Sequence, residues 1–284
     1  MLNSIVKNKK WIIRFFVAVG LLLLIEIYIY VSNSNKRKEP YTITFIVDEA
    51  SSNDYENMKA GAQNAALDSN CIIDFVDESK GDSVNANQII KVTDDSLSYS
   101  KGELKVDDEA MISDLVDYIL ADGDYNKFLL VSCGTNENID NLVSIFEARF
   151  SEDDYKVEYR PLSTDSKKLN QSMYNLEQSG LFDCVIALDT ETIKAACESN
   201  NLTNKFVNVY GMDNSSEAVY YLDTGALGAI AYKDEYSMGY IAVRQLLKDK
   251  DINNVAKDRS FYYIADRQTM YSDELEKVLF PFVK

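Results

Sequence analysis

The chain alternates between short apolar runs and stretches in which apolar residues recur every three or four positions. Continuous apolar runs are typical of strands that are buried on both faces of a parallel sheet, and the longer period is that of an amphipathic helix. Because the two patterns take turns along the chain, they predict an α/β fold in which parallel sheets are flanked by helices. The predicted strands cover residues 41–47, 71–76, 88–93, 104–106, 128–132, 156–160, 184–188, 206–210, 227–232 and 261–264.

Residues 206–247 carry the clearest pattern. The first apolar run stops at Gly211, and the polar residues 213–215 are typical of a helix start. Gly225 stands where a left-handed cap would end that helix, and another apolar run follows it. Over residues 236–247, apolar positions return at the helical period. The stretch therefore predicts strand, helix, strand and helix, in that order.

The spacing of the glycines in this stretch resembles that of the type I periplasmic-binding-protein family, which includes ribose- and galactose-type sugar-binding proteins and the sugar domains of LacI-type repressors. The shared marks are Gly211-Met212-Asp213 after a strand, Gly225 before the next strand, and Gly239 inside the following helix. The resemblance implies a two-lobed fold that closes on a small solute, here a sugar. It also implies a binding protein and not an enzyme.

The same resemblance implies how the chain divides. Residues 41–123 and 234–257 would form the N-terminal lobe, and residues 124–233 and 258–284 the C-terminal lobe. The chain would then cross between the lobes near 123, 233 and 257. Residues 77–107 depart from the family, because its members have about two further strand–helix units there. The first lobe is therefore expected to be reduced.

Parallel α/β sheets bind ligands at the carboxyl ends of their strands, and several polar residues fall there. By resemblance, Tyr55 would stack on a sugar ring, and Asp189 and Asp213 would accept hydrogen bonds from sugar hydroxyls. Lys233 would contact the ligand from the hinge between the lobes. Asn141 stands where many family members have an arginine. The predicted ligand-binding residues are Ser52, Tyr55, Asp107, Asn141, Asp189, Asp213 and Lys233.

Each of these residues also has a purely structural interpretation. Asp107 and Asp213 stand where helices begin, so they can be N-terminal caps and nothing more. Tyr55 can belong to the core, and Lys233 can be a solvated hinge residue. The sequence leaves both interpretations open.

The N-terminal segment 11–32 is apolar enough to cross a membrane. Its apolar core, residues 11–31, would span about 31 Å as a helix, which is enough for the hydrocarbon core of a bilayer. No small-residue cleavage site follows, so the sequence favours an uncleaved anchor over a signal peptide. Residues 1–10 would be a cytoplasmic tail and residues 33–40 a linker. Combined with the family resemblance, this predicts a single-pass protein of the cell membrane with its main domain extracellular.

Charge and composition exclude several classes of function. The net charge is −17, and the first forty residues hold seven basic and two acidic side chains, so the rest carries −22. So acidic a domain is not expected to bind nucleic acid. The chain has no histidine, the commonest zinc ligand and general base, and no cofactor or metal is expected. The four cysteines stand far apart, which favours free thiols over disulfides.

Taken together, these features predict a membrane-anchored, extracytoplasmic solute-binding protein for a sugar. Its partner would be an ABC permease, as in an ABC transporter, or a sensor histidine kinase. An alternative is a degenerate binding-protein fold that acts as a protein-interaction or sensory module without a small ligand. A carboxylate-dependent glycosidase is a further alternative, although no local pattern singles out a catalytic pair.

Overall fold

The structure is a computed structural model of the chain. The predicted cytoplasmic tail, linker and nearly all of the predicted anchor lie outside the described residues. Within the described part, no helix has both the length and the apolar character needed to cross a membrane. The structure describes residues 21, 25–26, 41–48, 55–67, 69, 71–84, 86–93, 96–202, 206–247, 259–273, 275 and 279.

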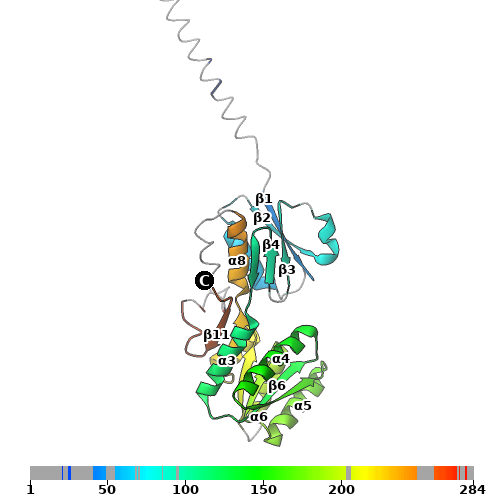
Figure 1. The fold of residues 1–284 in the computed structure, drawn as a ribbon, viewed down its shortest axis with the longest axis vertical. Helices are drawn as coiled ribbons and strands as arrows, with labels where there is room; N and C mark the ends of the chain where they lie inside the picture. The colour runs from blue at the N-terminus through cyan, green and yellow to red at the C-terminus, as the bar shows by residue number, and fades with distance from the viewer. Residues whose placement is uncertain are drawn as a thin grey trace, which may run out of the picture. The chain divides into compact units, whose positions relative to one another are not determined.

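The described chain from residue 42 onward contains two sheets, here called the first and second sheets (Figure 1). The first sheet has the strand order β2-β1-β3-β4-β5. Strand β1 runs parallel to β3, but β3, β4 and β5 form antiparallel pairs. Its strands are β1 (Tyr41–Val47), β2 (Cys71–Asp77), β3 (Gln88–Val92), β4 (Ser96–Tyr99) and β5 (Gly102–Lys105).

The first sheet therefore corrects the prediction of parallel sheets throughout, because it is mixed. Strand β4 is not among the strands that the sequence predicts. Its sequence, Ser-Leu-Ser-Tyr, is short and half polar, and it forms a strand because it pairs with a neighbour on each side. A short 3₁₀ helix, η2 (Glu78–Ser83), follows β2.

Two helices pack together beside the first sheet, α2 (Glu56–Ala66) and α8 (Glu235–Leu246). Their backbones meet at two glycines. A Cβ atom on Gly61 would lie 2.0 Å from the carbonyl oxygen of Tyr236, and one on Gly239 would lie 2.4 Å from that of Met58. Only glycine permits this approach, which explains the mid-helix Gly239 that the sequence singled out. Helix α8 also contacts β4.

The second sheet has the order β11-β10-β9-β8-β6-β7. Five strands are parallel, and β11 pairs antiparallel with β10. Its strands are β6 (Lys127–Cys133), β7 (Lys156–Leu162), β8 (Cys184–Ala187), β9 (Asn208–Met212), β10 (Ala229–Lys233) and β11 (Tyr262–Asp266). The helices are α3 (Asp108–Asp122), α4 (Glu137–Glu152), α5 (Ser166–Ser179), α6 (Thr190–Leu202) and α7 (Ser216–Thr224).

Both faces of the inner strands of the second sheet, β6, β8, β9 and β10, are buried. Alternate strand residues such as Leu129 and Val185 pack with helices α5, α6 and α7, while Leu130 and Ile186 pack with α3 and α4. Figure 1 shows α4, α5 and α6 grouped around β6. The apolar runs of these strands have no polar alternation because neither face meets water.

Helix α3 corrects the predicted division of the chain. Residues up to 123 were assigned to the first lobe, but α3 contacts α4, β10 and β11. Its apolar side chains, including Ile112 and Leu115, belong to a core shared with the second sheet. The chain therefore passes from one sheet to the other between Lys105 and Asp108, and not near 123. The period of a helix shows that one face is apolar, but not which sheet covers it.

Candidate functional site

Two neighbouring cavities lie at the carboxyl ends of strands from both sheets. One has a volume of about 270 Å³ and is lined mainly by first-sheet elements, and the other has about 200 Å³ and is lined mainly by second-sheet elements. We call them the first-sheet cavity and the second-sheet cavity. Asn138, Lys233 and Glu235 line both, so the two cavities form one cleft. A small ligand would span both, since small-molecule sites commonly exceed about 300 Å³.

The first-sheet cavity is polar on its first-sheet side. Tyr55 precedes helix α2, and its hydroxyl donates a hydrogen bond to the carboxylate of Asp48, which follows β1. The hydroxyls of Thr93 and Ser96 lie 2.9 Å apart, at the turn between β3 and β4. This wall thus offers hydroxyl, phenol and carboxylate groups, which suit a ligand rich in hydroxyls.

Asp213 lines the second-sheet cavity. Its carboxylate accepts hydrogen bonds from the Thr190 hydroxyl and, at 2.9 Å, from the backbone N–H of Asn214. The interpretation of Asp213 as a helix cap is wrong, because Ser215 caps helix α7 by accepting from the N–H of Ala218 at 3.3 Å. Strand β9 continues to Met212, and the chain needs two further residues to turn into the helix.

Lys233 ends β10 and lines both cavities. Its ammonium lies 3.5 Å from the carboxylate of Asp108, at the first turn of α3, and only 19% and 11% of the two side chains are exposed. The interpretation of Lys233 as a solvated residue is therefore wrong. The ion pair links two places where the chain passes between the sheets, one just before α3 and the other just after β10. It holds the ammonium of Lys233 where the two cavities meet.

Asp189 is engaged within the second sheet. One carboxylate oxygen accepts from the backbone N–H of Cys133 at 2.6 Å, and the other accepts from the N–H and the hydroxyl of Thr192, both at 2.9 Å. Asp189 is not among the residues that line either cavity of the cleft. Burial raises the pKa of the Cys133 thiol, and the charge of Asp189 raises it further, so this cysteine is not an activated nucleophile.

Asp107 and Asn141 line a different cavity, of about 540 Å³, beside the start of α3. Asp107 caps this helix, with its carboxylate accepting from the N–H of Ala110 at 2.9 Å. Ser52 lies outside the described residues. The structure thus brings Tyr55, Asp213 and Lys233 to the cleft.

Asn138 and Glu235 line the cleft but were not predicted from the sequence. Asn138 lies one turn before Asn141 on the same helix, α4. A usable signal was present, because Asn136 is a cap residue and accepts from the N–H of Ile139 at 2.8 Å. Starting the helix there would have placed Asn138 in its first turn, next to the end of β6. Among the described residues, no group of three or more cysteine, aspartate or glutamate side chains is arranged to hold a metal ion.

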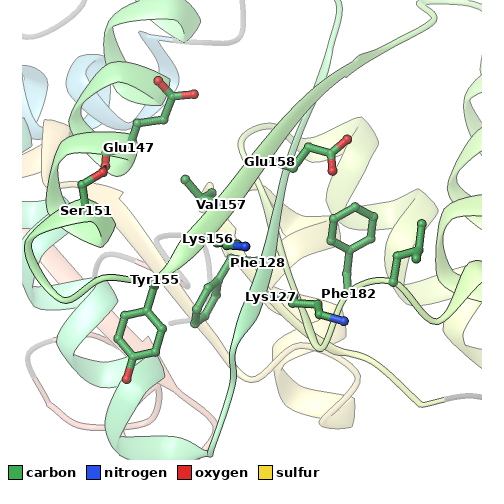
Figure 2. Close-up of a pocket in the computed structure, with 10 residues that line it drawn as sticks. Lys127, Phe128, Glu147, Ser151, Tyr155, Lys156, Val157, Glu158 and Phe182 are labelled. Atoms are coloured by element: carbon green, nitrogen blue, oxygen red, sulfur yellow. The ribbon is translucent and has the colours of Figure 1, made fainter.

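A larger cavity, of about 600 Å³, lies at the opposite, amino ends of β6 and β7. Figure 2 shows Glu147 and Ser151 on one helix at its left, Phe182 at its right, and Lys156 between them. Open parallel sheets bind their ligands at the carboxyl ends of strands. For this reason we place the functional site at the cleft, despite its smaller volume.

No model of a protein family matches the chain, and no curated protein matches it in sequence. Solved structures do match it. An arabinose-binding protein from Geobacillus stearothermophilus has a TM-score of 0.60 at 9% identity, covering 81% of this chain and 97% of its own. A solute-binding protein from Agrobacterium vitis with bound D-fucose has a TM-score of 0.64 at 14% identity, covering 84% and 100%.

A third similar structure is the sugar-binding protein of a sugar ABC transporter from Bacillus halodurans, with a TM-score of 0.63 at 11% identity, covering 81% of this chain and 98% of its own. At these identities the likeness concerns the fold alone. The structure neighbours of this chain are sugar ABC-transporter solute-binding proteins, and its fold is that of the type I periplasmic binding proteins.

Proposed function

We propose that this protein is a solute-binding protein that holds a small sugar in the cleft. The observation that carries the proposal is the convergence of Tyr55, Asp213 and Lys233 on the two joined cavities. A phenol ring can lie against the apolar face of a sugar, and a carboxylate and an ammonium can bond its hydroxyls. The fold is shared with proteins whose structures contain D-fucose and D-arabinose, which supports the same class of ligand here.

A role in binding, and not in catalysis, fits the similar structures whose titles describe solute-binding proteins of ABC transporters. We further propose that residues 11–32 anchor the chain in the cell membrane, with the main domain extracellular. The closed form would then be presented to an ABC permease or to a sensor histidine kinase. Protease added to intact cells should release a soluble fragment that begins near residue 35, and a fully protected domain would contradict this.

A thermal-shift screen of the full-length chain, purified in mild detergent, against a library of monosaccharides tests the binding. A ligand that binds only the folded state raises its stability by about 2.7 kcal/mol at a concentration of 100 times Kd. Asp213→Asn should reduce this shift, because a charge-assisted hydrogen bond is roughly twice as strong as a neutral one. Asp165→Asn is the matched control, since Asp165 caps α5 and is not among the residues that line the cleft.

A second candidate function is a protein-interaction or sensory module without a small ligand. The observation that favours it is the exposure of one face of the first sheet, where Lys91 and Glu103 meet solvent. The same screen separates the two functions. If no monosaccharide raises the melting temperature, the cleft is not a sugar site and the second function is preferred.

A further inference from the structure

The two cavities of the cleft have a negative balance of charge. Among the described residues that line them, the carboxylates are those of Asp48, Asp213 and Glu235. The ammonium of Lys233 is the one basic group among the same residues, and it lies 3.5 Å from the carboxylate of Asp108, which offsets its charge. The described part of the cleft therefore favours a ligand that carries a positive charge.

The first-sheet cavity is also rich in hydrogen-bond acceptors. The carboxylates of Asp48 and Glu235 only accept, and the hydroxyl of Tyr55 directs its proton to Asp48. The hydroxyls of Thr93 and Ser96 lie 2.9 Å apart, and that of Thr93 also accepts from the backbone N–H of Ser96 at 3.2 Å. Carboxylate and hydroxyl oxygens accept more than one hydrogen bond each, so this wall suits a ligand group that donates several.

The helices that begin beside the cleft do not reverse the preference for positive charge. The N-terminus of a helix attracts anions, because its backbone N–H groups carry a partial positive charge. Each of α2, α3, α4, α7 and α8, however, has an acidic residue in its first turn. Two of the caps are carboxylates as well, Asp107 in α3 and Asp234 in α8. The charge of these side chains offsets the helix dipoles.

We propose that the cleft binds an amino sugar of the hexosamine class, with its ammonium in the first-sheet cavity beside Asp48 and Glu235. The ring hydroxyls face Asp213 and Lys233. This rests on the proposed function, because it names which sugars the cleft selects. An ammonium donates three hydrogen bonds and carries a charge, whereas a hydroxyl is neutral and donates one. Replacing a neutral hydrogen bond by a charge-assisted one corresponds to about tenfold in Kd.

The test uses sets of sugars that differ in one group. Isothermal titration of the full-length chain in mild detergent is carried out at about pH 6, where amines are protonated and carboxylates are ionised. The parents are D-glucose, D-galactose and D-mannose, each with its 2-amino form and its N-acetyl form, which keeps the nitrogen but not the charge. In at least one set, the amino sugar should bind about tenfold or more tightly than the other two members.

The other outcomes overturn the inference. If the parent or the N-acetyl form binds as tightly as the amino sugar in every set, the charge is not recognised, and the proposed function still stands. If no sugar of the three sets binds, the inference is also wrong, and the thermal-shift screen against the monosaccharide library decides the proposed function separately.

A variant locates the ammonium. Asp48→Asn removes a charge but keeps an oxygen that can accept from the Tyr55 hydroxyl, and it should lower the ratio of the parent's Kd to the amino sugar's Kd toward one. Asp74→Asn, an exposed change on β2 that is not among the cleft-lining residues, should leave the ratio unchanged. Glu235→Gln, on α8, carries the same expectation as Asp48→Asn if that variant fails to fold. If both variants fold and keep the full ratio, the ammonium does not lie in the first-sheet cavity and the inference is wrong.

Discussion

The first and second sheets differ in what lies on their faces. All four residues of β8 in the second sheet are buried, and helices cover both of its faces. In β3 of the first sheet, Ile90 is fully buried, whereas its neighbours Ile89 and Lys91 are exposed. The second sheet is thus an inner layer, while part of the first sheet is an outer one.

The connections between strands explain the difference. Two parallel strands need a crossover of a dozen or more residues, usually a helix, and that helix then covers the sheet. Only residues 93–95 join β3 to β4, and only residues 100–101 join β4 to β5. Such short connections permit antiparallel pairing alone and bring no covering helix. Strands β3, β4 and β5 are therefore joined without a crossover helix, and one face of this part of the first sheet is exposed.

We expect the largest loss in the free energy of unfolding from a change at the junction between the two sheets. Asp234 is fully buried between β10 and α8, accepts from the N–H of Ser237 at 3.0 Å, and pairs with Arg259 at 2.7 Å. Arg259→Ala should cost about 3–5 kcal/mol in the free energy of unfolding, because it leaves the fully buried charge of Asp234 without its partner. Urea denaturation measures this. Asp153→Ala, which breaks an exposed pair with Arg149, should cost under about 1 kcal/mol.

Matched isoleucine substitutions test the comparison of the sheets directly. Ile186→Ala, in the middle of β8, should cost about 2–5 kcal/mol, because it removes buried surface and leaves a cavity. Ile89→Ala, at a position that is 38% exposed, should cost less than about 1 kcal/mol. The midpoints of urea denaturation give both values. Equal losses would show that the exposed face of the first sheet is covered by something else.

The sequence analysis predicted the elements of the second sheet better than those of the first sheet. Residues 206–247 form β9, α7, β10 and α8 as predicted, with Gly225 in the left-handed conformation at φ 77°. There the apolar runs are continuous and Gly225 marks a turn, although β9 runs through Gly211 to Met212 instead of stopping at that glycine. The antiparallel β4 was missed because its alternation is short, and such strands are defined by their partners and not by their own pattern.

At the site, the sequence could place residues at the ends of strands, but it could not show which turn of a helix faces the cleft. Tyr55, Asp213 and Lys233 reach the cleft, whereas Asn141 lies one turn away from it and Asn138 takes that place. A shift of three residues along a helix changes neither composition nor period. The engagement of Asp189 with a neighbouring strand depends on sheet order, which the sequence of a single strand does not contain.

A change between α2 and α8, the two helices beside the first sheet, should cause a smaller loss in the free energy of unfolding. Gly239→Ala would place a methyl group 2.4 Å from the carbonyl oxygen of Met58 and push α8 away from α2. We expect a loss of about 1–3 kcal/mol, the usual cost of overpacking, with no change in the shape of the denaturation curve. Circular dichroism during urea denaturation measures it. An unchanged midpoint would mean that the two helices can separate freely, in contrast to the helices of the second sheet.

The smallest effect comes from a buried acid in the helical layer of the second sheet. Glu177 on α5 is 2% exposed, and its carboxylate accepts from the Ser199 hydroxyl on α6 at 2.6 Å. Burial raises the pKa of Glu177 to about 7, from an ordinary value of 4.5, although the bond from Ser199 opposes the rise. Below pH 4.5 both folded and unfolded states hold the proton, so this group adds no pH dependence there.

Between pH 4.5 and 7 the unfolded chain ionises at Glu177 while the folded chain stays protonated, so stability falls as pH rises, and the loss is complete above about pH 7. The melting temperature should therefore be lower at pH 8 than at pH 5, by about 2–4 °C for each kcal/mol lost in a domain of this size. Glu177→Gln should remove this decline, because the amide has no charge to bury. Glu147→Gln, an exposed change on α4, should keep it. If the melting temperature of Glu177→Gln still falls between pH 5 and pH 8, then ionisation of Glu177 is not the cause of the fall. Water would then reach this carboxylate between α5 and α6, much as water reaches the exposed face of the first sheet.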